Sequence, residues 1–323
     1  MAGDLGAVRR RLADFDDGLV VTHERPDGDA IGSLLGLTLS LRKQGKRAVA
    51  VIPGGLPERF ASLPGGEWVR SGWPADPTPV IAVDCADQER IAPPWPPAWP
   101  PPDVNIDHHA TNTRFGQVNL IDPRATATAE VLYDLASELG LPLDADVATN
   151  LLAGIVTDTI GFRTDNVTPA ALRKAAALVE AGGRLQEVYE RLLTQRPLAS
   201  ARYWGAGLSH LQRQGDVLWS HLTLDDRVAA GYEGDDDADL VNFLSTVDGA
   251  SVTVLFVEQP GSKVKVSWRA RGGVDVSRLA QTFGGGGHEP AAGATLDGRL
   301  EDVERLVLTA TARSLSGVAP TQG

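Results

Sequence analysis

The chain has 323 residues, of which 42% are hydrophobic, and a formal net charge of −12. This length and composition predict a sizeable buried core divided between two domains. The negative charge argues against a surface that neutralises many phosphates of a long nucleic-acid duplex. The single cysteine, Cys85, excludes an intrachain disulfide framework and cysteine-rich zinc sites. The N-terminus lacks an apolar signal core and no stretch approaches ~18 apolar residues, so we expect a cytoplasmic protein without membrane contact.

Short apolar runs alternate with helix-like segments in the first half of the chain. The run "GLVVTH" precedes "AIGSLLGLTLSLRKQG", and further apolar runs are "RAVAVI", "TPVIAVDC" and "DVNIDHH". Strand, helix and strand at this pace predict a parallel sheet with crossover helices. The proline-rich insert at 92–102 suits neither a helix nor a central strand, so we interpret it as a stiff surface connector.

The second half begins with a helical pattern and ends with further strands. Helical periodicity extends from 126 to about 210, and strands return in "DVLWSHLTL", "ASVTVLFVEQ" and "SKVKVSWRARG". We therefore predict an α/β protein with an N-terminal parallel-sheet domain and a smaller C-terminal α/β domain. The expected boundaries are 1–190 for the first domain, 191–212 for a helical linker and 213–323 for the second domain.

Side chains able to bind metals follow three of the predicted strands. His23 follows "LVVT", Asp84 follows "VIAV", and the sequence Asp-His-His at 107–109 follows "VNI". The carboxyl ends of strands in an open parallel sheet line one crevice, so we expect these clusters to meet. Asp158, after the apolar helix "VATNLLAGIVTD", leads into a turn that we expect to return to the same rim.

Each of these side chains, taken alone, also has a structural interpretation. Asp29 alone is better explained as the N-cap of a helix that begins at Ala30. His23 alone is typical of a partly buried histidine, and Asp84 alone of an acid at a strand end. The tandem histidines at 108–109 argue for function, because a strand end rarely needs two imidazoles.

Imidazoles and carboxylates without a thiolate suit Mn²⁺, Mg²⁺, Fe²⁺, Co²⁺ or Zn²⁺. The donors expected at this rim exceed what one cation needs, so the sequence predicts a site for two metals. Two adjacent metals lower the pKa of a bridging water and stabilise the attacking and leaving oxygens of phosphoryl transfer.

The C-terminal region carries two features that suit anions. Four glycines at 284–287 precede His288, and glycine lets backbone amides approach a ligand closely. We favour an anion pocket here over a flexible hinge. In "KVKVSWRAR", the basic residues occupy alternate positions, so on a strand they share one face. That face is either exposed to solvent or in contact with a phosphate group. That face comprises Lys263, Lys265, Ser267, Arg269 and Arg271.

These blocks resemble the DHH/DHHA1 phosphoesterase family, named for the Asp-His-His found here at 107–109. The family's order is kept in "THERPDGDAIGS", "VDCAD", "NIDHHATN", "TDTIGFRTDN" and "FGGGGHEPAAG", which together span nearly the whole chain. The compact layout is similar to the nanoRNase and pAp-phosphatase branch. That resemblance implies hydrolysis of short 5′-phosphorylated oligoribonucleotides to mononucleotides, and of 3′-phosphoadenosine 5′-phosphate (pAp) to AMP.

The resemblance also implies a role for each matching residue. It implies two divalent cations, with Mn²⁺ favoured and Mg²⁺ or Co²⁺ as alternatives. One cation is expected on His23, Asp27 and Asp84, and the other on Asp29, Asp84, His108 and Asp158, with Asp84 bridging. His109 is expected to contact the attacked phosphate, and Asp107 to orient a histidine. Substrate contacts are expected from Ser267, Arg269, Gly285, Gly286, Gly287 and His288.

Other functions stay open from the sequence. A cyclic-dinucleotide phosphodiesterase, or one that cleaves the linear dinucleotide product, shares both kinds of domain. An inorganic pyrophosphatase shares the metal motifs but has a different C-terminal domain. An inactive nucleotide sensor is disfavoured because every presumed metal ligand is present. Substrate preference, polarity of cleavage, the physiological metal and the oligomeric state, including a homodimer, are left open.

Overall fold

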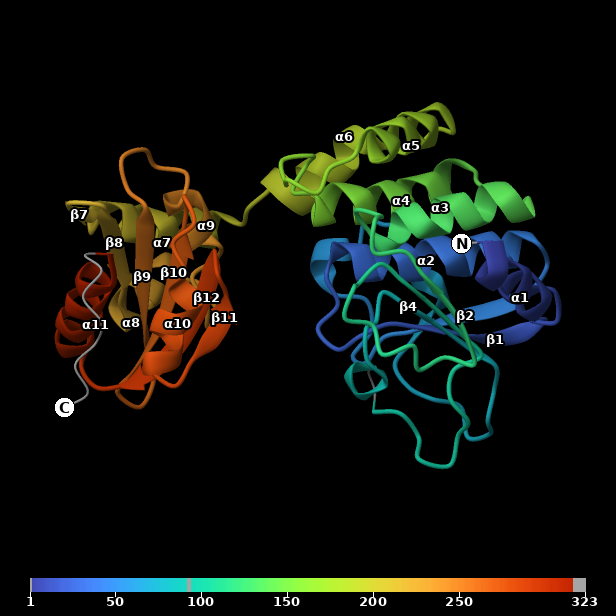
Figure 1. The fold of residues 1–323 in the computed structure, drawn as a ribbon, viewed down its shortest axis with the longest axis horizontal. Helices are drawn as coiled ribbons and strands as arrows, with labels where there is room; N and C mark the ends of the chain where they lie inside the picture. The colour runs from blue at the N-terminus through green and yellow to red at the C-terminus, as the bar shows by residue number, and fades with distance from the viewer. Residues whose placement is uncertain (1, 92–93, 316–323) are drawn as a thin grey trace. The chain divides into compact units, whose positions relative to one another are not determined.

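The computed structural model describes residues 2–91 and 94–315 (Figure 1). The chain forms two compact units that divide between Gln195 and Arg196, and each is described by itself. No helix within the described ranges combines the length and the apolar character that a membrane span requires. The predicted α/β class is confirmed, with a parallel sheet in the first unit and a second α/β unit after it.

A six-stranded parallel sheet forms the centre of the first unit, in the order β3-β2-β1-β4-β5-β6. The strands are β1 (Asp17–Val21), β2 (Arg47–Val51), β3 (Val69–Arg70), β4 (Val80–Val83), β5 (Val104–Asp107) and β6 (Val118–Ile121). The chain leaves β1 toward β2 and β3, then returns to β4 on the other side of β1. The carboxyl ends of β1 and β4 therefore flank the point where the strand order reverses, which is where open α/β sheets bind ligands.

Helices pack on one face of this sheet (Figure 1). They are α2 (Gly28–Lys43), α3 (Thr128–Leu139), α4 (Ala145–Asp158) and, farther out, α5 (Pro169–Glu180); α1 (Ala2–Ala13) packs beside β6. Short helical turns complete the unit: η1 (Glu58–Phe60), η2 (Gly66–Trp68), η3 (Gln88–Arg90), α6 (Leu185–Val188) and η4 (Tyr189–Thr194). Leu34 of α2, Ile81 of β4 and Leu152 of α4 are fully buried in the shared core, as the apolar runs in the sequence require.

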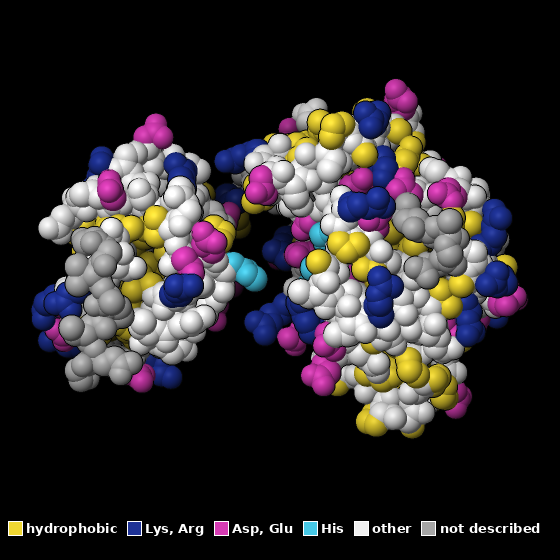
Figure 2. All heavy atoms as spheres, in the orientation of Figure 1, with side chains coloured by type: hydrophobic (Ala, Val, Ile, Leu, Met, Phe, Trp, Pro, Cys, Tyr) yellow, Lys and Arg dark blue, Asp and Glu magenta, His cyan; other side chains and the backbone are white. Residues whose placement is uncertain are grey.

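The other face of the sheet is covered by loops and tryptophans instead of helices. Trp73, Trp95 and Trp99 contact one another edge to face, with ring centroids 5.3–6.1 Å apart, and pack against buried strand residues. Residues 94–102 contain neither helix nor strand, as predicted, but they are more than a surface connector because two of these tryptophans cover the sheet. Residues 92–93 lie outside the described residues. Figure 2 shows hydrophobic side chains gathered on the surface over these loops.

A mixed six-stranded sheet forms the second unit, in the order β11-β12-β10-β9-β8-β7. Its strands are β7 (Gln212–Gln214), β8 (Val217–Leu222), β9 (Val252–Gln259), β10 (Lys263–Ala270), β11 (Gly286–His288) and β12 (Ala291–Asp297). Its helices are α7 (Leu198–Ser209), α8 (Leu224–Ala230), α9 (Leu240–Leu244), α10 (Val276–Thr282) and α11 (Leu300–Leu315). The alternation predicted for β10 is confirmed, since Val264, Val266 and Trp268 are fully buried while Lys263 and Lys265 are exposed.

Candidate active site

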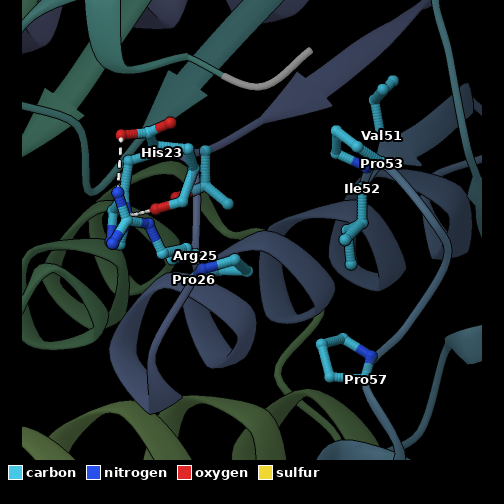
Figure 3. A pocket seen from close by; sticks show the side chains of 9 residues that line it. His23, Arg25, Pro26, Val51, Ile52, Pro53 and Pro57 are labelled. Atoms are coloured by element: carbon cyan, nitrogen blue, oxygen red, sulfur yellow. Dashed lines mark hydrogen bonds and ion pairs between the residues drawn. The ribbon is translucent and has the colours of Figure 1, made fainter. Parts of the chain in front are cut away.

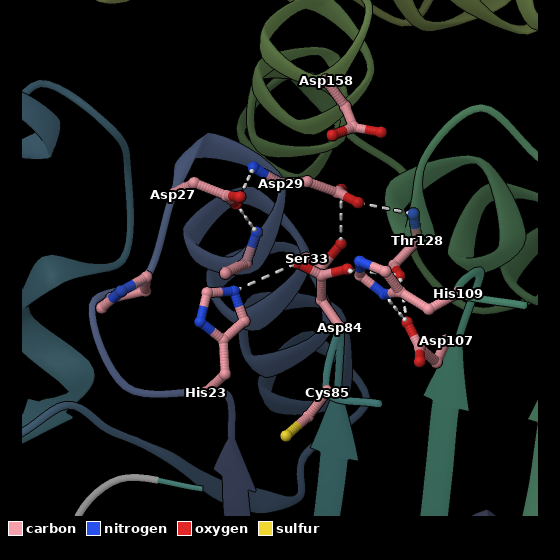
Figure 4. A network of polar contacts seen from close by, with 12 residues as sticks. His23, Asp27, Asp29, Ser33, Asp84, Cys85, Asp107, His109, Thr128 and Asp158 are labelled. Carbon is pink, nitrogen blue, oxygen red and sulfur yellow. Dashed lines mark hydrogen bonds and ion pairs between the residues drawn. The ribbon is translucent and has the colours of Figure 1, made fainter. Parts of the chain in front are cut away.

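Charged side chains from three strand ends and two helix ends meet at the carboxyl edge of the parallel sheet (Figure 4). His23 follows β1, Asp84 follows β4 and Asp107 is the last residue of β5. The start of α2 adds two aspartates, and Asp158 is the last residue of α4. The structure thus brings together all six residues expected to bind metals: His23, Asp27, Asp29, Asp84, His108 and Asp158.

Three sets of three donors have their ligand atoms within 4.8 Å of one another, which is close enough for a common cation. The sets are His23, Asp27 and Asp84; Asp29, His108 and Asp158; and Asp84, His108 and His109. All donors are imidazole nitrogens or carboxylate oxygens, which fits borderline or hard divalent cations. The neighbouring thiol of Cys85 belongs to none of these sets, and burial raises its pKa to about 12.

Asp84 joins these sets through its two carboxylate oxygens. Its Oδ2 lies 3.7 Å from His23 Nε2, and its Oδ1 lies 3.8 Å from His108 Nε2. Burial opposes ionisation of this carboxyl, but the His23, His108 and His109 imidazoles outweigh burial and hold the pKa of Asp84 below its ordinary value. The backbone at Asp84 has a φ of 52°, a left-handed conformation that strands rarely end with. The two oxygens of Asp84 therefore face two different sets of donors.

Asp29 is held by the first turn of α3. Its carboxylate accepts hydrogen bonds from the backbone N–H of Thr128 at 2.6 Å and of Ala129 at 3.0 Å, and from the Ser33 hydroxyl at 3.1 Å. The side chain is almost fully buried, and this burial, together with the nearby charges of Asp84 and Asp158, raises the pKa of Asp29 well above its ordinary value. A helix N-terminus and a cation can both stabilise such a buried carboxylate.

The N-cap of α2 corrects the structural interpretation of Asp29. Asp27, not Asp29, caps this helix, because its Oδ1 accepts the backbone N–H groups of Asp29 at 3.1 Å and Ala30 at 3.0 Å. The helix accordingly begins at Gly28 and not at Ala30. Both capping bonds go to Oδ1, and Oδ2 takes part in neither. The same carboxylate can therefore cap the helix through Oδ1 and bind a cation through Oδ2.

Asp107 uses its carboxylate to fix the histidines that follow it. Its Oδ1 accepts from His109 Nδ1 at 2.7 Å and from the His108 backbone N–H at 2.8 Å, and its Oδ2 accepts from Asn112 Nδ2 at 2.6 Å. The hydrogen bond from His109 raises the pKa of that imidazole to about 9, against the effect of burial, and so favours the protonated ring in the metal-free protein. The ring lies beside Asp84.

Asp158 lies at the C-terminus of α4, where backbone carbonyls add partial negative charge. Burial raises the pKa of Asp158 to about 6; His108 opposes this effect, and Asp84 and Asp27 reinforce it. Close packing of α2 against α4 brings this end of the helix to the site. A Cβ atom on Gly154 would overlap Asp29 Oδ1, and one on Gly32 would overlap the carbonyl oxygen of Asn150.

Sequence reasoning missed two polar groups that complete the network. The Thr128 hydroxyl lies 2.9 Å from Asp84 Oδ1, and Asn112 Nδ2 also contacts the carbonyl oxygen of Cys85 at 3.1 Å. Asn112 is the last residue of the block "NIDHHATN" but was given no role there, and Thr128 is a common residue type with no distinctive spacing. The only signal for Thr128 is its position at the start of a helix that follows the metal motifs, and that signal is weak.

The residues expected to bind substrate lie in the second unit. Arg269 on β10 donates from Nε to Asn242 Oδ1 at 2.7 Å and from Nη1 to the Trp268 carbonyl at 2.9 Å. Strand register places Arg269 opposite Ala291, which in turn lies opposite His288 on β11. Paired residues of antiparallel strands point to the same face, so Arg269 and His288 share one face of the sheet.

The glycine run has a more regular structure than the sequence predicted. Gly286 and Gly287 belong with His288 to the edge strand β11, an element that was not among the strands predicted from the sequence. Gly286 pairs with Gly293, which also lies opposite Ser267 on β10. A Cβ on Gly285 would overlap the Gly293 carbonyl oxygen, so close strand packing alone requires glycine there. Because β11 is an edge strand, one row of its backbone groups is unpaired within the sheet.

Known proteins share both the sequence blocks and the fold. The family model "DHH family, N-terminal domain" matches residues 18–155, and the "DHHA1 domain" model matches residues 223–313. A Thermus thermophilus protein named bifunctional oligoribonuclease and PAP phosphatase NrnA is 40% identical over 307 residues, covering 92% of this chain and 90% of that protein.

Two solved structures extend the likeness to the fold. An exopolyphosphatase-related protein from Bacteroides fragilis has a TM-score of 0.81 at 21% identity, covering 98% of this chain and 96% of that one. Exonuclease RecJ bound to manganese has a TM-score of 0.51 at 15% identity, covering 99% of this chain and 95% of that one. At these identities the two structures show the fold alone.

Proposed function

Because the chain belongs to the DHH/DHHA1 phosphoesterase family, we propose that it hydrolyses short 5′-phosphorylated oligoribonucleotides to mononucleotides and pAp to AMP. The observation that carries this proposal is the position of Asp84, whose two oxygens face different sets of metal donors. The relative from Thermus thermophilus, which matches along most of both chains, supports the same substrates.

The proposed cofactor is a pair of divalent cations, with Mn²⁺ ahead of Mg²⁺ and Co²⁺. The nitrogen and oxygen donor set favours such ions, and a solved structure with the same fold holds manganese. When bound, two adjacent cations supply an activated water and stabilise charge on the phosphoryl oxygens. One cation would be held by His23, Asp27 and Asp84, and the other by Asp29, Asp84, His108 and Asp158.

The chain's own residues orient and stabilise the reacting phosphate. The cationic His109 lies beside Asp84, so its free Nε2–H is available to a phosphate oxygen, where it would stabilise the charge that develops on attack. Asp107 holds this imidazole through Nδ1 and fixes both its orientation and its protonation. The Thr128 hydroxyl bonds to Asp84 Oδ1, the same oxygen that the His109 ring faces.

The second unit is proposed to select the substrate by a further phosphate group. Arg269, Ser267 and His288 share one face of the sheet. Arg269 and Ser267 lie on β10, while His288 lies with Gly286 and Gly287 on the edge strand β11, beyond β12; Gly285 directly precedes β11. A guanidinium, an imidazole and glycine backbone amides together suit a phosphate. Short single strands fit a chain of net charge −12 better than long duplexes do, and we place the enzyme in the cytoplasm.

A substrate panel tests this function. Initial rates would be measured with a 5′-phosphorylated adenine dinucleotide, pAp, pyrophosphate and a cyclic dinucleotide, each with Mn²⁺ and after chelation. We expect metal-dependent release of mononucleotide from the dinucleotide and of phosphate from pAp. Consumption of pyrophosphate or the cyclic dinucleotide with the linear dinucleotide intact would refute the proposed substrates while leaving the metal centre in place.

A further inference from the structure

A pocket of about 300 Å³ opens between the loops that follow β1 and β2 (Figure 3). Residues 22–26 form one wall, and residues 51–53 with Pro57 form the other. The pocket therefore lies beside the point where the strand order reverses, at the same edge of the sheet as the metal donors. Its volume is within the range of small-molecule sites.

The walls of this pocket are mostly apolar. Pro26, Ile52, Pro53 and Pro57 line it, and proline rings offer stiff, flat apolar surfaces. Such walls cannot compensate a phosphate for the loss of its water shell. They suit an uncharged, flat group.

One residue belongs both to the pocket and to the metal centre. His23 lines the pocket, and its Nε2 lies 3.7 Å from Asp84 Oδ2. A ligand with a phosphate at the metal centre therefore has its neighbouring groups close to the pocket opening. In a nucleotide, the flat and uncharged neighbouring group is the base.

The polar groups of the pocket lie at its rim. Glu24 Oε1 and Arg25 Nη2 are 3.7 Å apart, and their side chains are 58% and 90% exposed. Their donors and acceptors can meet the edge of a base whose faces contact the apolar walls. Thr22 also lines the pocket, and its buried hydroxyl has no hydrogen-bond partner among the described residues.

The two walls are tied together before any ligand binds. Arg59 Nη2, from η1, donates to the Pro26 carbonyl oxygen at 3.0 Å and so links the two loops. Arg25 has a φ of 52°, an uncommon conformation for a residue with a side chain. Strained backbone of this kind is concentrated at binding sites, where the surrounding structure maintains it.

We propose that this pocket binds the base of the nucleotide whose phosphate lies at the metal centre. The inference rests on the proposed function, and it adds a second recognition site within the first unit. Discrimination between nucleotides and other phosphate esters then arises next to the metals as well as at Arg269.

Substrates that lack one base test the proposal. The substrates are the 5′-phosphorylated adenine dinucleotide and two versions of it, each missing one of the adenines. The proteins are wild type, Pro53→Trp and Pro57→Trp, which fill the pocket from two positions, and Pro77→Trp as the matched control. Pro53 and Pro77 are both exposed, and Pro77 lies in the loop before β4, at the amino edge of the sheet.

One of the two adenines is expected to occupy the pocket. In wild type and in Pro77→Trp, we expect removal of that adenine to lower kcat/KM by about tenfold or more. In the pocket-filling variants, we expect this ratio between intact and base-lacking substrate to fall to about one, because neither substrate can use the pocket. A ratio that stays unchanged in both pocket-filling variants would overturn the proposal. So would a wild-type enzyme that is insensitive to the loss of either base.

Failure of the proposed function gives a different result. If wild type cleaves no dinucleotide, the proposed reaction is wrong, and calorimetric titration of AMP and of ribose 5-phosphate into the Mn²⁺-loaded protein tests the pocket without turnover. Tighter binding of AMP in wild type, with the difference lost in Pro53→Trp and kept in Pro77→Trp, supports the base site. Equal binding of both ligands to wild type refutes it.

Discussion

The Thr128 hydroxyl links the first turn of α3 to Asp84, while the Thr128 backbone N–H binds Asp29. One residue thus fixes two carboxylates of the proposed metal centre from the side that faces the protein interior. Its two contacts can be separated experimentally, because substitution of the side chain leaves the backbone hydrogen bond in place.

Thr128→Val removes the hydroxyl while keeping the shape of the side chain. A hydrogen bond to a charged group contributes about 1.5–3 kcal/mol, so we expect kcat for the dinucleotide to fall about tenfold or more, with KM little changed. The control is Thr38→Val, whose buried hydroxyl donates to the Leu34 carbonyl of its own helix. Steady-state kinetics would contradict this role for Thr128 if the two variants had the same kcat.

The raised pKa of Asp158 predicts how metal binding depends on pH. With a pKa of about 6 in the metal-free protein, this carboxyl is protonated below that pH and ionised above it, and Asp29 is shifted in the same direction. Protons therefore compete with cations in acid. We expect Mn²⁺ to raise the unfolding temperature strongly at pH 8 and only weakly at pH 5. Differential scanning fluorimetry measures this, and an equal shift at both pH values would show that these carboxyls do not bind the cation.

Of the predicted metal donors, His23, Asp84 and His108 drew attention in the sequence because they follow apolar strands. Asp27 and Asp29 stand close to His23 in the chain, and Asp158 ends an apolar helix. The supporting contacts could not be identified from sequence, since Thr128 is 99 residues from Asp29 and 44 from Asp84 in the chain. The role of Asp27 shows a second limit of prediction from sequence. Asp27 and Asp29 stand two positions apart at one helix start, and only backbone geometry decides which of them is the cap.

At the scale of elements, the close approach of α2 and α4 places Asp29 near Asp158. Glycines on both helices make this approach achievable, because side chains at these positions would separate the helix axes. The metal centre therefore depends on the helix pair as much as on the strand ends.

Gly154→Ala tests this dependence. Its new methyl group would overlap the Asp29 carboxylate, so we expect the free energy of unfolding to fall by about 1–3 kcal/mol and the Mn²⁺ affinity to fall with it. The control is Gly205→Ala in α7, where a Cβ meets no atom within 4 Å and helix propensity predicts a gain of up to about 1 kcal/mol. Chemical denaturation and metal titration measure both effects, and a stable Gly154→Ala variant with unaltered metal affinity would contradict the account.

The longer strands and helices were predictable from the periodicity of apolar residues. The packing of the proline-rich segment and the edge strand β11 were not. The tryptophans of the proline-rich segment carry no periodic signal, and their packing against the sheet depends on Trp73, which is distant in the chain. Glycine has a low intrinsic preference for strands, so the edge strand β11 exists because of its pairing with β12. Tertiary contacts decided both cases.

At the scale of the whole molecule, the proposed function places metal binding in the first unit and selection of the remote phosphate in the second. Arg269 belongs to the second unit, where Asn242 and the Trp268 carbonyl hold its guanidinium. Substitutions there should therefore alter substrate binding and leave metal binding intact.

Arg269→Ala should raise KM for the dinucleotide about tenfold, because a charge-assisted contact to phosphate is lost, and should leave Mn²⁺ affinity unchanged. Arg278→Ala is the control, since this arginine of α10 is 87% exposed and pairs only locally with Asp275. Kinetics and metal titration on the same preparations separate the two effects. A loss of metal affinity in Arg269→Ala would refute the division of labour.

The most direct test of the central claim is the initial rate of mononucleotide release from the 5′-phosphorylated dinucleotide, at saturating Mn²⁺, in wild type and Asp84→Asn. Asparagine keeps the shape of the side chain but lacks the charge and one of the two oxygens that face the donor sets. Asp76→Asn, an exposed aspartate in a loop, serves as the control. A bridging Asp84 predicts a loss of about a thousandfold or more in kcat. An Asp84→Asn rate within tenfold of wild type would contradict a shared two-metal centre.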